Sequence, residues 1–94
     1  MNPDQRYTKN DNIVLREEED GAFLFDPDTG NLKYLNKSAK ETFLMLNGQN
    51  DLNQVANRLS ELYPDAGSEQ IRNDVVSFLQ ELLENSFAFP VEGS

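Results

Sequence analysis

Short apolar runs and alternating positions fill the first third of the chain, and they predict strands. We expect three of them, at residues 13–17, 21–26 and 31–35. Pro27-Asp28-Thr29-Gly30, between the last two, is typical of a turn, because proline fixes φ and glycine accepts positive φ. The pattern therefore predicts a small three-stranded antiparallel sheet that contains a hairpin.

From residue 37 onward the apolar residues recur at helical spacing, which predicts three helices. Asn36 is a suitable N-cap for the first helix, expected over residues 37–46, and Gly48 follows it as a C-cap glycine. Asp51 is a suitable N-cap for the second helix, and Ser68 for the third. Three strands followed by three helices predict an α+β fold.

The predicted third helix carries more apolar side chains than one buried face needs. Its core face is expected to consist of Ile71, Val75, Phe78 and Leu82. One flank of that face adds four further residues: Arg72, Val76, Leu79 and Leu83. This flank either packs against the sheet and the C-terminal segment or forms the wall of a groove. The second alternative makes the four residues candidates for binding.

The remaining segments predict where the folded domain begins and ends. Residues 1–12 are almost entirely polar, and we expect them to be a disordered tail. Residues 13–91 are expected to form a single domain, in which the apolar stretch 87–91 is extended and packs back on the rest. Residues 92–94 are expected to be disordered. A chain of 94 residues is long enough for one small domain with a modest core.

The composition removes several classes of function. The chain has neither histidine nor cysteine, which removes thiol nucleophiles, imidazole acid–base catalysis and the usual zinc ligands. Its serines have no histidine to activate them, so we expect no enzyme, no metal and no cofactor. The acidic run at residues 17–20 lacks the spaced ligands of a calcium-binding loop, and we interpret it as a solvated turn.

The charge and the hydropathy limit the possible partners. With 17 acidic residues against 8 basic ones the net charge is −9, which disfavours nucleic acid. No apolar run approaches the roughly 20 residues that a membrane-spanning helix needs. We therefore expect a cytoplasmic protein. The acid-free residues 31–40 hold Lys33, Lys37 and Lys40, and they predict a local basic rim that favours acidic side chains in a partner.

The last predicted strand is the candidate binding site. A hairpin that continues directly into a helix leaves this strand as an open edge, to which another chain can pair. The candidate residues on it are Asn31, Leu32, Lys33, Tyr34 and Leu35. Self-association through the same edge is the alternative to a monomer.

Several short motifs resemble the PqqD family. They are Phe23-Leu24-Phe25-Asp26, the turn with Gly30, Tyr34-Leu35-Asn36, Gly48 after the first helix, Val55 and Leu59 before Tyr63, and Asp74-Val75, Phe78-Leu79 and Leu82. The likeness extends over about residues 13 to 89. The family's usual Gly-Leu-Ile at the end of the last helix is replaced here by Asn85-Ser86-Phe87-Ala88.

The resemblance implies a winged-helix-like fold of three strands followed by three helices. It also implies a function, which is to bind the leader of a ribosomally made precursor peptide and to present it to a modifying enzyme, often a radical S-adenosylmethionine enzyme. In such proteins the leader adds as a strand beside the third strand and lies against the third helix. This is where the residue pattern alone predicts the open edge and the spare apolar flank.

Two other classes of function remain as alternatives. A winged-helix transcription regulator would share the architecture, but the net charge of −9 argues against DNA binding. An acidic adaptor such as a carrier protein would need an Asp-Ser pair at a helix start, and the chain has none.

Overall fold

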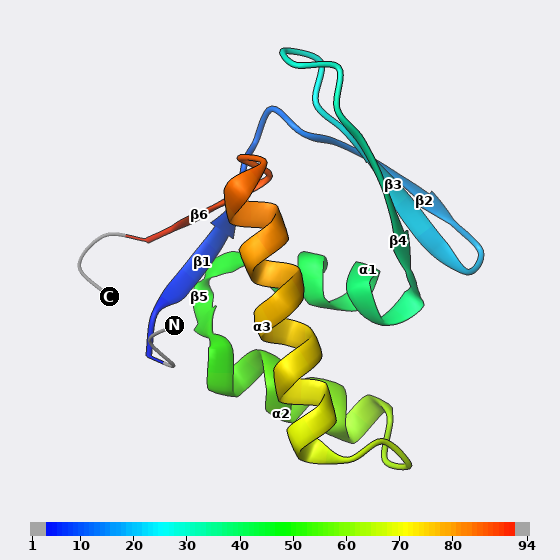
Figure 1. Ribbon diagram of the computed structural model, residues 1–94, viewed down its shortest axis with the longest axis vertical. Coiled ribbons are helices and arrows are strands. Elements are labelled where there is room, and N and C mark those ends of the chain that lie inside the picture. Colours follow the sequence, from blue (N-terminus) through cyan, green and yellow to red (C-terminus); the bar gives the residue numbers. More distant parts are fainter. Residues whose placement is uncertain (1–3, 92–94) are drawn as a thin grey trace.

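Two three-stranded antiparallel sheets and three helices make up the fold in the computed structural model, which describes residues 4–91 (Figure 1). The first sheet has the order β2 (Val14–Glu18), β3 (Gly21–Phe25), β4 (Leu32–Asn36). The second has the order β5 (Asn47–Asp51), β1 (Arg6–Lys9), β6 (Ala88–Pro90). The helices are α1 (Lys37–Leu44), α2 (Leu52–Leu62) and α3 (Ser68–Glu84).

The sheet β2–β3–β4 forms as the sequence predicts. Its first and last strands begin and end one residue later than expected, and β3 ends one residue earlier. Its β3–β4 turn closes because the Gly30 amide donates to the Asp26 carbonyl over 2.7 Å, with Gly30 at φ +80°. Alternate residues of β3 point to opposite faces of the sheet. Ala22 and Leu24 are completely buried, whereas Phe25 is 40% exposed. The sheet therefore has one face on the core and one face toward solvent.

Side-chain caps define the starts of α1 and α2, as predicted. The Asn36 side chain accepts a hydrogen bond from the Ala39 amide over 2.9 Å. Asp51 caps α2 by accepting from the Gln54 amide, and the Gln54 side chain accepts in return from the Asp51 amide. Such a reciprocal pair satisfies two amides that have no partner within the helix.

The sequence prediction of a disordered tail over residues 1–12 is wrong for part of that segment. Residues 6–9 form β1, the central strand of the second sheet, and Tyr7 on it is only 3% exposed. The partners of β1 are β5, between α1 and α2, and β6 near the C-terminus. The predicted disorder of residues 1–3 and 92–94 lies outside the described residues.

Two predicted helix ends also differ. Gly48 has φ +83°, but it lies within β5, because this segment pairs with β1, and α1 already ends at Leu44. Gly67 rather than Ser68 is the N-cap of α3, and it offers no side-chain hydrogen bond.

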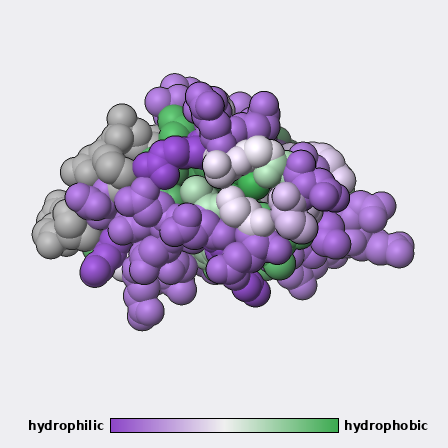
Figure 2. Space-filling view, turned by 90° about the horizontal axis from the view of Figure 1, so that it is seen from below, coloured by the Kyte–Doolittle hydropathy of each residue, from purple (hydrophilic) through white to green (hydrophobic). Residues whose placement is uncertain are grey.

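One core lies between the inner face of the sheet β2–β3–β4, the three helices and the second sheet. From α3 it takes Ile71, Val75, Leu79 and Leu82. The C-terminal segment packs back as expected, with Phe87 and Ala88 buried. Seen from below the view of Figure 1, hydrophilic side chains cover most of the visible surface, and apolar ones show between them near the middle and in small spots toward the edges (Figure 2).

Candidate functional site

β4 is an edge of its sheet, and its main-chain groups are divided between two sides. The Asp26 amide donates to the Asn31 carbonyl over 2.9 Å, which marks a hydrogen-bonded pair at the start of the ladder. Because such pairs alternate in an antiparallel ladder of regular register, Lys33 and Leu35 bond to β3. The amides and carbonyls of Leu32 and Tyr34 therefore face the free edge, the side of β4 away from β3. They can accept another strand.

The other edge of this sheet, β2, is less suited to strand addition. It ends in Glu17 and Glu18 and runs into the turn with Glu19 and Asp20. Arg16 pairs with Glu18 along the strand, at 3.3 Å between Nε and Oε1. Charged side chains on an edge strand discourage pairing with a further chain. Of the two edges, β4 is the one left open to a peptide.

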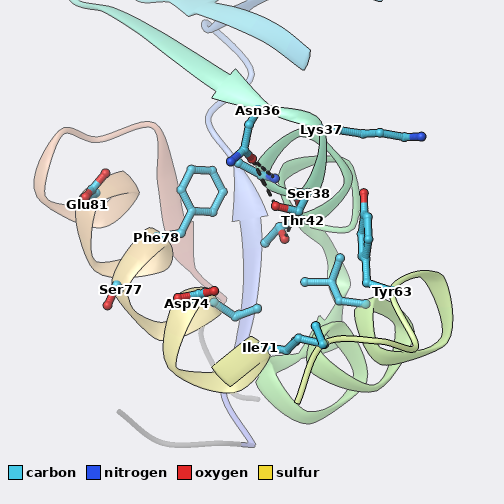
Figure 3. Close-up of a pocket in the computed structure, with 14 residues that line it drawn as sticks. Asn36, Lys37, Ser38, Thr42, Tyr63, Ile71, Asp74, Ser77, Phe78 and Glu81 are labelled. Atoms are coloured by element: carbon cyan, nitrogen blue, oxygen red, sulfur yellow. Dashed lines mark hydrogen bonds between the residues drawn. The ribbon is translucent and has the colours of Figure 1, made fainter. Parts of the chain in front are cut away.

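A cleft of about 720 Å³ opens where β4 ends, between the first turn of α1 and one flank of α3. We call it the α1–α3 cleft. Three helices supply most of its apolar lining, and the α2–α3 connection adds Ala66: the helical residues are Ala39, Leu59, Ile71, Val75 and Phe78. In Figure 3, Phe78 reaches into it from α3, and Tyr63 lies on the opposite side, at the end of α2. A cleft of this size and lining can take an apolar side chain from a peptide that pairs with β4.

Three polar residues at the α1 side of the cleft, Asn36, Ser38 and Thr42, take part in hydrogen bonds at the start of the helix. Besides capping Ala39, the Asn36 side chain accepts from the Ser38 hydroxyl over 3.1 Å. Thr42, which is buried, donates its hydroxyl to the Ser38 carbonyl over 2.9 Å. Figure 3 shows these hydrogen bonds at the start of α1. They hold the helix start in place beside β4, next to the apolar lining of the cleft.

The charges around the cleft differ from the basic rim that the sequence predicted. Lys33 points from β4 to α3, where its Nζ lies 2.6 Å from Glu81 Oε2. Asp74 and Glu81 both line the cleft, beside a single lysine, Lys37. In Figure 3 the Lys37 side chain extends away from these two carboxylates. The acid-free stretch of sequence is therefore not acid-free in space, because α3 brings carboxylates to it.

The predicted groove wall on α3 lies on the opposite flank from the α1–α3 cleft. Of the four residues proposed for it, none lines the cleft. Arg72 donates instead to the Asn53 side chain on α2 over 2.8 Å, and Leu79 is completely buried. Val76 and Leu83 are half-buried and pack against the core. Their contact with a peptide stays a prediction, one that the position of the cleft does not favour.

Six α3 residues line the cleft, and none of them was a candidate for binding in the sequence prediction. Ile71 and Val75 belong also to the buried face, and the others are Asp74, Ser77, Phe78 and Glu81. The sequence prediction placed Phe78 in the core. The signal available was the spacing of Ile71, Val75, Leu79 and Leu82, which are the buried residues of this helix. Centred on those four, the buried face leaves Phe78 on its margin.

Comparison with known proteins identifies the family. Residues 21–88 match the family described as Coenzyme PQQ synthesis protein D (PqqD). The chain belongs to the PqqD family. The match begins with β3 and ends with the first residue of β6, so it includes β4 and all three helices. No curated protein matches the sequence.

Three solved structures share the PqqD-like fold of this chain. One is of TbiB1 in complex with the TbiA(beta) leader peptide, with a TM-score of 0.76, 17% identity, and coverage of 93% of this chain and 96% of that one. A second is of lasso peptide synthetase B1 complexed with the leader peptide, with a TM-score of 0.77, 22% identity, and coverage of 90% and 99%. The third is of the heterocyclase TruD, with a TM-score of 0.61 and 17% identity. It covers 96% of this chain, which spans only 12% of TruD.

The described residues offer neither a metal site nor a membrane span. Among residues 4–91 there is no group of three or more acidic side chains placed to hold a metal ion. No helix in the same part of the chain has the length and apolar character needed to cross a membrane.

Proposed function

We propose that this protein binds the leader segment of a ribosomally synthesised precursor peptide and presents it to an enzyme that modifies the rest of that peptide. The leader pairs as an added strand with the free edge of β4 and places one apolar side chain in the α1–α3 cleft. The observation that carries the proposal is the free edge at Leu32 and Tyr34, next to an apolar cleft at the end of the same strand. PqqD family membership and the two leader-bound structural relatives support it.

The added strand gives affinity and the cleft gives selectivity. Main-chain hydrogen bonds along β4 are independent of the leader's sequence, whereas the cleft selects for the side chain that enters it. The modifying enzyme, a radical S-adenosylmethionine enzyme in our proposal, receives the precursor with its leader held in one extended register. The protein itself contributes no reacting group to that chemistry and acts in the cytoplasm as a monomer.

Hydrogen exchange at individual amides tests the strand pairing. We expect a short precursor gene beside the gene for this protein, and a synthetic peptide with the leader sequence of that precursor is added to isotopically labelled protein. The amides of Leu32 and Tyr34 should exchange slowly only after the peptide is added. Those of Lys33 and Leu35 should be protected in both states, since they already bond to β3. A peptide that binds without protecting Leu32 and Tyr34 would exclude strand addition at β4.

Truncation of two neighbouring α3 side chains tests the position of the cleft. Phe78 and Val76 are both half-buried on α3, but only Phe78 lines the α1–α3 cleft. We expect Phe78→Ala to weaken leader binding by about tenfold, the effect of losing a well-packed aromatic contact. Val76→Ala should change the affinity by less than about twofold. Isothermal titration calorimetry measures both. A larger loss of leader affinity in Val76→Ala than in Phe78→Ala would show that the leader binds at the flank with Val76 and Leu83.

A further inference from the structure

The outer face of the sheet β2–β3–β4 carries an apolar patch that the core does not use. The register puts five apolar side chains of this face in two adjacent rows: Val14, Phe25 and Leu32 in one, and Phe23 and Tyr34 in the other. Val14, Leu32 and Tyr34 are each more than half exposed. The Phe23 and Tyr34 rings lie 5.2 Å apart. Arg16, beside Phe23, is the charged residue within these rows. We call this set the outer-face patch.

The patch has the composition of an interaction surface. Three of its five apolar residues are aromatic, the type enriched at the centres of protein interfaces. Four of them, with Arg16, line a shallow hollow of about 350 Å³. The inner face of the same sheet already supplies the core through Ala22, Leu24 and Leu35. The apolar outer face is therefore not explained by folding.

The patch is continuous with the proposed leader site. In a sheet, side chains of neighbouring strands line up in rows across each face. A leader strand added to β4 would place every second side chain beside Leu32 and Tyr34, on the outer face. The patch would then extend across four strands, the last contributed by the leader. A protein that covers this face would contact the leader and its carrier together.

The charges at the two ends of the sheet indicate the chemistry of the partner. One end is the β2–β3 turn, with the acidic run from Glu17 to Asp20, and the other is the β3–β4 turn, where Asp28 is exposed and Asp26 is buried. A second copy of this chain would bring acidic ends and a net charge of −9 against the same charges. A partner with an apolar centre and a basic rim fits instead.

We propose that the outer-face patch docks the modifying enzyme, through an apolar surface with a basic rim on that enzyme, and that the bound leader completes the docking face. This inference rests on the proposed function. It adds the surface that contacts the enzyme and a difference between the enzyme's affinities for the leader-loaded and the free protein. The enzyme binds the leader-loaded protein more tightly than the free protein. By linkage, the enzyme raises the affinity for the leader by the same factor.

A matched pair of substitutions tests the proposal. Phe25 on β3 and Phe89 on β6 are 40% and 43% exposed, but only Phe25 belongs to the patch. The probes are the synthetic leader peptide of the expected precursor and the purified enzyme that modifies that precursor. We expect Phe25→Lys to weaken enzyme binding by at least about tenfold and to leave leader affinity within about twofold. Phe89→Lys should change neither. Saturating leader should tighten enzyme binding to the unmodified protein.

Other results would overturn the proposal. Equal enzyme binding by the Phe25→Lys and Phe89→Lys proteins would show that the patch is not a contact. A parallel loss of leader and enzyme affinity in Phe25→Lys would assign the patch to the leader site itself. Concentration-dependent dimers in sedimentation, abolished by Phe25→Lys, would show that a second copy covers it. If the Phe25→Lys protein shows no thermal transition and is therefore unfolded, the same measurements are made with Val14→Lys on β2. Failure of the unmodified protein to bind leader would refute the proposed function, while enzyme binding would still test the patch.

Discussion

Tyr34→Pro is expected to remove most of the leader binding while the domain stays folded. The Tyr34 amide faces the free edge of β4, so proline there removes a donor that β3 does not use. Proline is tolerated on edge strands for this reason. A leader strand would meet the proline ring where it needs an N–H group. An unpaired carbonyl on the leader would then cost about 1–3 kcal/mol.

The control for this experiment is Tyr34→Ala, which removes the same side chain and keeps the amide. We expect Tyr34→Pro to bind the leader at least about tenfold more weakly than Tyr34→Ala, because about 1.4 kcal/mol corresponds to a factor of ten. Calorimetry with the synthetic leader gives both affinities. Equal affinities of the two variants would show that the amide at the free edge takes no part in binding.

The neighbouring position gives the opposite expectation. Lys33→Pro removes an amide that bonds to β3 and also breaks the ion pair with Glu81. Its thermal midpoint should therefore fall well below that of Tyr34→Pro, although the two substitutions lie one residue apart. Circular dichroism on heating measures the difference. The pair of variants separates loss of the binding edge from loss of the fold.

Elements with a local cause could be predicted from the sequence. The caps at Asn36 and Asp51 depend on side chains within three residues of the amides they bind, and both are confirmed. The β3–β4 hairpin depends on its turn residues and on alternation in the strands, and it too forms as predicted. Because β2, β3 and β4 follow one another along the chain and each pairs with the next, β4 lies at an edge of the sheet.

The second sheet could not be predicted in the same way. Its central strand, β1, contains one large apolar residue, Tyr7, among polar neighbours. Its partners are segments about 40 and 80 residues away along the chain. Strand formation at residues 6–9 depends on those partners and not on local preference, which is weak and context-dependent for strands. The same dependence turned Gly48 from an expected helix cap into part of β5.

The candidate site was predicted in part, for a geometric reason. The β4 candidates follow from topology, whereas the α3 candidates depended on the rotation of a helix about its axis. Leu79 belongs to the buried face and Phe78 to its margin. The prediction placed Phe78 in the core face and Leu79 on the flank, which is the reverse of the structure. The expected groove was therefore placed on the opposite flank of α3. Five apolar residues of α3 lie close to the buried face, and their spacing shows how wide that face is. It does not show which of the five lies at the centre of the face and which at its margin.

Gly21→Ala is expected to lower the stability of the protein more than any surface change considered above. Gly21 begins β3 opposite Asn36, and a Cβ atom at this position would meet the Leu35 carbonyl oxygen, a main-chain atom that cannot rotate away. Its backbone must shift, and overpacking of this kind costs about 1–3 kcal/mol. For a domain of this size each kcal/mol lowers the melting temperature by roughly 4–8 °C. We expect a fall of about 12 °C in a calorimetric scan, within a range of about 4–24 °C.

Gly67→Ala is the matched control for this substitution. A Cβ atom at Gly67 would have open space around it, and its φ of −66° suits any residue. Alanine is a poorer N-cap than glycine but lowers the entropy of the unfolded chain, so the two effects nearly cancel. The melting temperature should stay within about 4 °C, equivalent to a fraction of a kcal/mol. Because Gly21 packs where β3 approaches the end of β4, its substitution should also weaken leader binding. Similar melting temperatures for the two variants would mean that β4 can move away from β3 at little cost, and that the β4 edge is not held rigidly for the leader.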